Sequence, residues 1–162
     1  MALLIRGKTQ CRLCGQVITE TDNVVSFPPI TVNEADGLFL FNDGSFHQAC
    51  FEAHPLAVSA QTRFEELRAH FGPGQRRCWS CNLEIVDPDN YFSIGYLGGD
   101  ISKNLQEFNY LQLHRTCIAG WNQADRLVDA LLRSRAEGQL KGAGAASLVD
   151  ELQTASTSRV VS

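Results

Sequence analysis

Two matching cysteine–histidine patterns constrain this chain more than any other feature of its sequence. Each pattern is a C-x-x-C pair whose second cysteine lies 33 positions before the histidine of an H-x-x-C pair. The eight residues are, in chain order, Cys11, Cys14, His47, Cys50, Cys78, Cys81, His114 and Cys117. All four positions of the first pattern recur exactly 67 positions later in the second. The chain is therefore an internal duplication.

The same offset of 67 positions also relates residues that are not candidate ligands. Without any gap it aligns Asp22-Asn23 with Asp89-Asn90, and Phe41-Asn42 with Phe108-Asn109. Hydrophobic character is kept at several further pairs between these landmarks. Agreement away from the cysteines indicates that the whole unit was duplicated, and not the ligand positions alone.

Metal chemistry explains why these residue types occur at these spacings. Zinc takes four ligands in a tetrahedron, and thiolate sulfur and imidazole nitrogen both suit it. Two cysteines separated by two residues can reach one ion from a tight turn, and H-x-x-C places both side chains on one face of a helical turn. Each repeat supplies a complete set of three cysteines and one histidine. We predict two structural Zn²⁺ ions per chain, because four protein ligands leave no open position for a catalytic water.

Two other readings of the cysteines stay open at this point. Six cysteines would suit a disulfide framework in a secreted protein. However, residues 1–6 have too short an apolar run and no preceding basic region for a secretory signal, and disulfides give the two matched histidines no role. An iron–sulfur cluster fits the histidine position less well than zinc does. We therefore expect zinc-bound thiolates in a reducing compartment, the cytoplasm.

The ligand pattern resembles that of treble-clef zinc fingers, and of the LIM family in particular. In those proteins a C-x-x-C knuckle leads into a β-hairpin, and the last two ligands come from the start of a helix. Cys11/Cys14 and Cys78/Cys81 match the knuckle, and both H-x-x-C pairs match the first module of a LIM domain. The 32 residues between the half-sites exceed the LIM spacing, and the second LIM motif does not follow at its usual short distance. The resemblance implies a LIM-like treble clef rather than a LIM protein proper.

This reading predicts an α+β fold of two tandem treble-clef-like repeats, packed pseudo-symmetrically. Each repeat would contain a knuckle, a β-hairpin and a following helix. Residues 1–74 would form the first repeat and residues 75–137 the second, with the boundary at Gly72-Pro73-Gly74. Residues 138–162 are rich in Gly, Ala, Ser and Thr, so we expect a flexible C-terminal tail with at most a short helix near residues 148–152.

Hydrophobic patterning and turn signals predict the individual elements. A helix capped by Ser59 would carry Phe64 and Phe71 on its apolar face, and a longer helix would run from about residue 114 to residue 136. The predicted strands cover residues 24–27, 38–41, 91–94 and 108–113.

The acidic balance of the chain bears on its partners. The formal charge is −4 with a pI of about 5.5, and two zinc ions held by three thiolates each would lower the charge further. DNA and RNA affinity depends largely on neutralising phosphates, so this charge argues against a nucleic-acid binder. If the alternative of a nucleic-acid-binding or transcription-associated finger holds, the best phosphate contacts are Arg76 and Arg77 beside Trp79, and Arg133 and Arg135.

Two histidines, His54 and His70, lie outside the ligand sets. His54 follows Cys50 by about one helical turn and could serve as a base or as an alternative ligand. The second repeat has Trp121 at the equivalent position, so a packing role for His54 is the better expectation. No G-x-S-x-G motif is present, and every cysteine is used by a predicted metal site. We expect no enzymatic activity, with a hydrolase using His54 or His70 as the lower alternative.

The function favoured by these observations is a zinc-stabilised protein-interaction module. An adaptor, or an inhibitor or immunity-type binder of another protein, fits a small acidic chain. Residues 28–37 and 95–104, where each repeat exceeds a minimal finger, are candidates for the contact surface or simply cover the hairpin. No apolar run approaches the roughly 20 residues needed to span a bilayer, so we expect no membrane partner.

Overall fold

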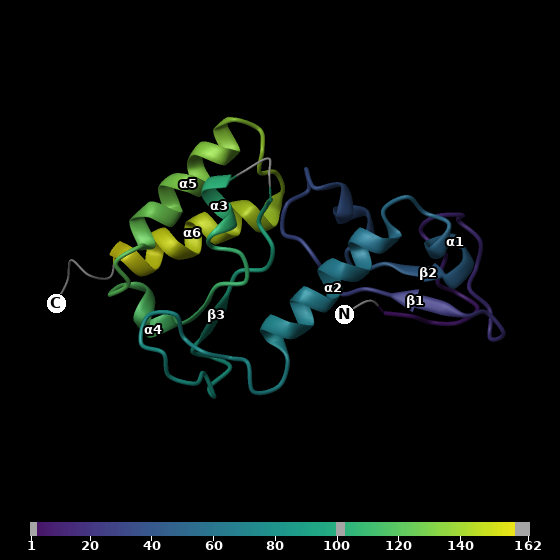
Figure 1. Cartoon of the computed structure of the whole chain (residues 1–162), viewed down its shortest axis with the longest axis horizontal. Helices are drawn as coiled ribbons and strands as arrows, with labels where there is room; N and C mark the ends of the chain where they lie inside the picture. Colours follow the sequence, from purple (N-terminus) through teal and green to yellow (C-terminus); the bar gives the residue numbers. More distant parts are fainter. Residues whose placement is uncertain (1–2, 100–102, 158–162) are drawn as a thin grey trace.

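The computed structural model describes residues 3–99 and 103–157, which form two lobes (Figure 1). Its helices and small antiparallel hairpins are consistent with an α+β fold. The first lobe contains β1 (Val24–Ser26), the 3₁₀ helix η1 (Gly37–Phe41), β2 (Ser45–His47), α1 (Gln48–Glu52) and α2 (Ala57–Phe71). The second contains β3 (Tyr91–Ser93), α3 (Lys103–Gln106), β4 (Gln112–His114), α4 (Arg115–Ile118), α5 (Ala124–Ala136) and α6 (Ala143–Thr157).

The two hairpins pair in the same register at the offset of 67 positions. β1 and β2 are antiparallel with Val24 opposite His47, and β3 and β4 are antiparallel with Tyr91 opposite His114. Each hairpin therefore brings its histidine to the same place relative to the strand that follows the knuckle.

The strand predicted over residues 38–41 is wrong, because these residues form η1. The Asp36 side chain accepts a hydrogen bond from the Leu38 amide (2.8 Å), which caps a helical turn instead of starting a strand. The chain then reverses through Asp43 at a φ of 47°, and only then does β2 begin. In the second lobe Tyr110 takes the equivalent conformation at a φ of 61°, so the strand predicted over residues 108–113 is confined to β4.

The helix predicted from residue 114 to residue 136 is interrupted between α4 and α5. Trp121 lies buried in this interruption, with its ring edge-on to Phe108 (6.1 Å between centroids, 86°). The first lobe has the same interruption between α1 and α2, where His54 lies edge-on to Phe41 (5.3 Å, 86°). In both lobes the break places an aromatic ring against a phenylalanine of the core, Trp121 buried and His54 half-buried. The second helix of the first lobe also begins at Ala57, before the predicted cap at Ser59.

The structure differs from the prediction of a flexible tail over residues 138–162. Residues 143–157 of this segment form α6, which packs against α5 and α4. Ala145, Val149 and Leu152 are buried in the core of the second lobe. Their spacing of four and three positions puts them on one face of the helix, which supplies the reason for its order. Residues 158–162 lie outside the described part of the chain.

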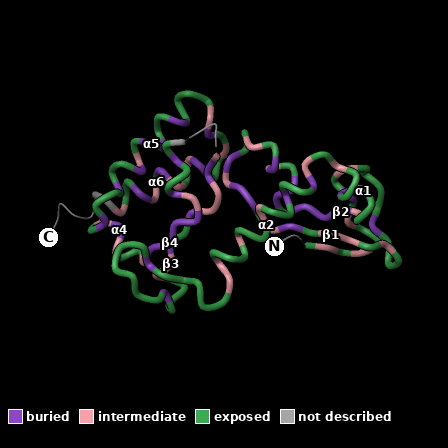
Figure 2. The backbone as a smooth tube through the Cα atoms, in the orientation of Figure 1, coloured by how far each residue is buried: buried purple, intermediate pink, exposed green. Residues whose placement is uncertain are grey.

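Each lobe has its own hydrophobic core, visible as two groups of buried backbone in Figure 2. The first core is built around phenylalanines from β2, η1, α1 and the strand end at Phe27. The second core is larger, because α5 and α6 pack on each other and both contribute buried residues to it (Figure 1). No helix in the described ranges is long and apolar enough to cross a membrane.

The segment 28–37 joins the two lobes. The Val32 amide donates to the Tyr96 carbonyl (3.0 Å), and Asn33 Nδ2 donates to the Gln139 carbonyl (2.8 Å). The Lys141 amide in turn donates to Asn33 Oδ1 (3.0 Å). Asn33 is buried by these contacts. This segment therefore contacts the second lobe of its own chain. One of the contacts is with Tyr96, which lies in segment 95–104, the equivalent segment of the second repeat. Residues 100–102 of that segment lie outside the described residues.

The C-terminal half of α2 forms the second connection between the lobes. Tyr110 donates its hydroxyl to Glu66 Oε2 (2.8 Å), and the ring of His70 stacks on the ring of Tyr110 (4.4 Å, 12°). The Arg63 guanidinium lies over the Tyr96 ring, 3.0 Å from its centroid. Cation–π and hydrogen-bond contacts thus connect α2 to the loops that precede β4.

Candidate metal centres

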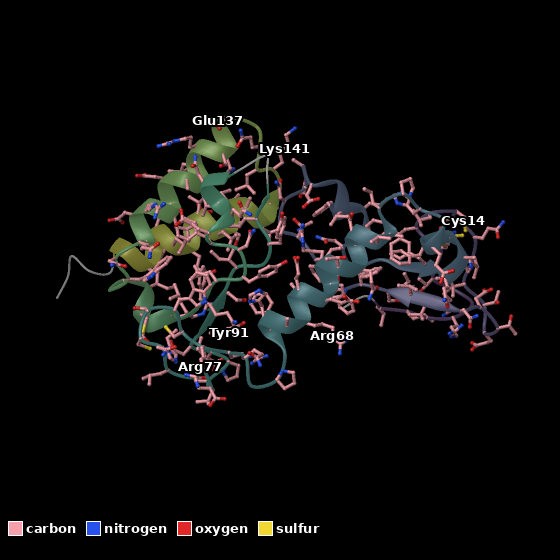
Figure 3. All side chains as sticks on the ribbon, viewed as in Figure 1. Cys14, Arg68, Arg77, Tyr91, Glu137 and Lys141 are labelled. Carbon is pink, nitrogen blue, oxygen red and sulfur yellow. The ribbon has the colours of Figure 1, made fainter. Side chains whose placement is uncertain are left out.

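The first four predicted ligands meet at the end of the first lobe. Cys11 and Cys14 come from the knuckle, His47 ends β2, and Cys50 lies in α1. All four ligand atoms lie within 4.8 Å of one another. Cys14 Sγ is 3.4 Å and Cys50 Sγ is 3.9 Å from His47 Nδ1. Figure 3 shows Cys14 at the tip of this lobe, away from the connection to the second lobe.

The second four predicted ligands meet in the same way in the second lobe. Cys78, Cys81, His114 and Cys117 also place their ligand atoms within 4.8 Å of one another. Cys81 Sγ is 3.4 Å and Cys117 Sγ is 3.9 Å from His114 Nδ1. These distances equal those of the first group, so the duplication of the sequence is a duplication of geometry as well.

The geometry of both groups fits a tetrahedral metal ion. With zinc–sulfur bonds of about 2.3 Å and zinc–nitrogen bonds of about 2.0–2.1 Å, sulfur and nitrogen ligands lie about 3.5 Å apart. The observed distances of 3.4 and 3.9 Å lie on either side of this value. Both groups could therefore hold a metal ion.

Backbone hydrogen bonds shape each knuckle. The Cys11 amide donates to the Gln16 carbonyl, and the Gly15 amide donates to the Cys11 carbonyl, both at 2.8 Å. Gly15 adopts a φ of 74°, as the tight turn requires. Asn82 occupies the equivalent position in the second knuckle at a φ of 58° and donates to the Cys78 carbonyl. Asparagine is the residue other than glycine that best tolerates this conformation.

The thiols of each group differ sharply in acidity. Burial raises the pKa of Cys11, but hydrogen bonds from the backbone of Cys14, His47 and Leu13 outweigh it and lower the pKa to about 6. Burial, together with hydrogen bonding and the negative charge of the neighbouring cysteines, raises the pKa of Cys50 to about 11.

The second group repeats this contrast, with the pKa of Cys78 lowered to about 6 and that of Cys117 raised to about 11. Burial again opposes the backbone hydrogen bonds at Cys78, and at Cys117 it acts in the same direction as the neighbouring thiols. Three thiolates in such a small volume repel one another, and a bound cation would compensate their charge.

A pair of equivalent asparagines supports the loop between the two half-sites in each lobe. Asn42 Oδ1 accepts hydrogen bonds from the Ile30 and Thr31 amides (2.8 and 3.2 Å), and its Nδ2 donates to the Thr31 carbonyl (2.6 Å). Asn109 makes the equivalent three bonds to Leu97 and Gly98. The two asparagines occupy equivalent positions 67 residues apart, but the sequence alone did not predict their role in holding a loop. The recurrence of asparagine at this offset was the one sign in the sequence that could have indicated it.

The two remaining histidines do not join either metal group. His54 Nδ1 accepts a hydrogen bond from the Leu56 amide (3.2 Å), and its ring packs on Phe41. His70 is exposed and stacks on Tyr110. Among the described residues, the only His/Cys/Asp/Glu groups close enough for a shared ion are the two above.

The arginines proposed for phosphate contact have different surroundings. The Arg76 guanidinium lies 5.0 Å from the centroid of the Tyr91 ring, and Arg77 Nη1 donates to the Asn82 carbonyl (3.0 Å). Arg133 and Arg135 are exposed near the end of α5. The four side chains are thus divided between the second knuckle and α5.

No family model, no curated protein and no solved structure matches this chain. The candidate sites therefore rest on their own geometry and chemistry.

Proposed function

We propose that the chain is a zinc-stabilised, non-enzymatic protein-interaction module with one structural Zn²⁺ in each lobe. The observation that carries the proposal is the pair of complete four-ligand groups with matching geometry. Sulfur-rich sets of this kind suit zinc. Cys11, Cys14, His47 and Cys50 would hold one ion, and Cys78, Cys81, His114 and Cys117 the other.

We further propose that each lobe is a LIM-like treble clef. The knuckle, the hairpin that delivers the histidine and the short helix that carries the last cysteine support this description. A pseudo-symmetric packing of the two lobes stays a prediction. The equivalent helices α2 and α5 have different neighbours, since α5 packs on α6 and α2 contacts the second lobe, so any symmetry would not extend to these contacts.

A protein partner is supported by the surface of the second knuckle. Trp79, Leu83 and Val86 are exposed there to 49%, 65% and 79%. The equivalent positions of the first knuckle carry Arg12, Gln16 and Thr19. Exposed apolar side chains that replace polar ones on an otherwise duplicated unit suit a contact with another protein, as an adaptor or an inhibitor would make. The compartment that fits metal-bound thiolates is a reducing one, such as the cytoplasm.

The metal part of the proposal is tested by native mass spectrometry and elemental analysis of the purified chain. We expect two zinc ions per chain, reduced to one by Cys14→Ser or by Cys81→Ser, because each change removes a ligand from one group only. Removal of zinc with a chelator should unfold at least the smaller first lobe, since binding energy of this kind is folding energy. A protein that holds no metal and keeps its fold would contradict the proposal.

The interaction part is tested with zinc-loaded protein as bait, comparing the wild type with a Trp79→Ser/Leu83→Ser variant. We expect a protein retained by the wild type in stoichiometric amount and lost by the variant. A Val58→Ser variant, changed at an exposed apolar position of α2, is the matched control. A salt-dependent gel shift with generic DNA or RNA, weakened by Arg76→Ala/Arg77→Ala, would instead support a nucleic-acid-binding finger.

A further inference from the structure

The two metal groups have identical ligands but different surroundings on the far side of the histidine. In the first group His47 Nδ1 faces the cysteine sulfurs, and His47 Nε2 lies 3.5 Å from Asp22 Oδ2. A metal-bound imidazole keeps its proton on the other ring nitrogen, and a carboxylate at that nitrogen fixes the orientation of the ring and raises the basicity of the ligand. Asp22 stands where such a carboxylate is needed.

Asp22 is itself held in place by its own loop. Its Oδ2 accepts hydrogen bonds from the Thr19 amide (2.6 Å) and the Thr19 hydroxyl (2.7 Å). Arg6 Nη1 donates to the carbonyls of Thr19 (2.6 Å) and Asp22 (3.0 Å), which ties both ends of the turn together. Thr19 therefore holds the carboxylate beside His47 directly, and Arg6 holds the backbone of the loop that carries it.

The second repeat keeps the aspartate but not its support. Asp89 is equivalent to Asp22, whereas Arg6 is replaced by Pro73 and Thr19 by Val86. Neither replacement has a side chain that can donate a hydrogen bond. The Asp89 amide bonds to Asp87 Oδ1 (3.0 Å) instead. Within the described ranges, no ion pair or hydrogen bond joins the Asp89 carboxylate to His114.

We infer that Asp22 is a positioning residue for the metal of the first site, and that Asp89 has no such role at the second. The metal affinity of the first site would then depend on the carboxylate beside its histidine, and that of the second site would not, although both have the same four ligands. This inference rests on the proposed zinc binding. Loss of an outer-shell partner typically lowers metal affinity by about 10–100-fold, so this is the effect expected of removing Asp22.

The matched pair Asp22→Ala and Asp89→Ala tests the inference on the full chain. Cadmium is used in place of zinc, so that each site gives its own ¹¹³Cd resonance, assigned with Cys14→Ser and Cys81→Ser. Titration with a chelator then measures the cadmium affinity of each site separately. We expect Asp22→Ala to weaken the first site by about 10–100-fold, and Asp89→Ala to leave the second site unchanged. An Asp22→Asn variant, which keeps an oxygen acceptor, should restore part of the loss.

A second measurement on the unaltered protein reports on positioning directly. The Nε2 proton of His47 should exchange with solvent more slowly than that of His114, because only His47 has a carboxylate partner. Equal exchange rates, or equal losses of affinity in the two alanine variants, would overturn the inference while leaving two bound ions. A wild-type chain without bound metal would instead overturn the proposed function.

Discussion

At the scale of single residues, the duplicated asparagines explain how both lobes hold a loop against their hairpin. Asn42 and Asn109 each use both ends of the side-chain amide to bond backbone groups of the segment eleven or twelve positions earlier. Asn42 is buried, and so is the Ile30–Thr31 peptide that it contacts. Buried backbone groups need partners, so a side chain supplies what a β-ladder would supply elsewhere.

Substitution of these asparagines should destabilise the fold. We expect Asn42→Ala to lower the free energy of unfolding by about 2–3 kcal/mol, because the buried amides and carbonyl of the loop lose their partner. Asn109→Ala should act in the same direction in the second lobe. The control is the exposed Asn122→Ala, which should stay within about 0.5 kcal/mol of the wild type. Denaturant unfolding in excess zinc measures all three, and equal effects of Asn42→Ala and Asn122→Ala would refute the assignment.

The equivalent residue in the second repeat indicates that His54 has a packing role rather than a catalytic or metal-binding one. His54 packs on Phe41, and Trp121, 67 positions later, packs in the same way on Phe108. We expect His54→Ala to lower the free energy of unfolding by about 1–2 kcal/mol while the chain still binds two zinc ions. Trp121→Ala should cost more, about 3–5 kcal/mol, because the buried ring is larger. A loss of one zinc ion from folded His54→Ala would show that His54 is a ligand after all.

At the scale of elements, the main departure from duplication is α6. The first lobe has no counterpart to this helix, because the equivalent positions, 76–90, already belong to the knuckle of the second repeat. In the second lobe α6 covers α5, which keeps Leu127 and Leu131 out of solvent. In the equivalent helix α2 only Ala57 and Ala60 are buried, and α2 meets the second lobe through polar and aromatic contacts.

The packing of α6 predicts a clear difference between two neighbouring residues. Leu152 is fully buried, whereas Gln153 is exposed. We expect Leu152→Ala to lower the free energy of unfolding by about 2–5 kcal/mol through the lost burial and the cavity left behind, and Gln153→Ala to have little effect. Thermal unfolding followed by circular dichroism would measure both. Similar melting temperatures for the two variants would argue that α6 does not pack on the core.

At the scale of the whole molecule, polar contacts of Asn33, Glu66 and Tyr110 hold the two lobes together. Partial burial, and next to it the hydrogen bond to Glu66, raise the pKa of Tyr110 above its ordinary value. The folded chain therefore holds this proton more tightly than the unfolded chain does. Protonated Tyr110 therefore contributes its full stabilisation of the folded chain below about pH 10, the pKa of tyrosine in the unfolded chain, and this stabilisation declines as the pH rises above that value.

The contact between the lobes should therefore weaken at alkaline pH in a way that depends on Tyr110. We expect the stability advantage of the wild type over Tyr110→Phe to be constant from pH 7 to pH 9 and to shrink above about pH 10. Denaturant unfolding of both proteins across this range, in the same metal buffer, measures the difference. An advantage that grows with pH would show that the hydroxyl is not held protonated by the fold.

Features set by local spacing could be read from the sequence. The two candidate ligand sets, the offset of 67 positions and the placement of both histidines at the end of a hairpin depend on residues that lie close along the chain or recur at that offset. The positions of the knuckles and of β1 and β3 follow from the same local signals. Ligand spacing is visible in a sequence because metal coordination demands particular residue types at particular intervals.

Other features were decided only by the tertiary structure. The segment 38–41 is a short apolar run of the kind that predicts a strand, but a cap at Asp36 and burial against the first core make it helical. The segment 138–157 has a tail-like composition, but α5 offers an apolar face that orders it. The sequence left segment 28–37 as either a contact surface or a cover for the hairpin, and the structure shows that it is hydrogen-bonded to the second lobe. The Asp36 cap is local, whereas burial against a core and contact with the second lobe involve residues from other elements, and no local pattern records such complementarity.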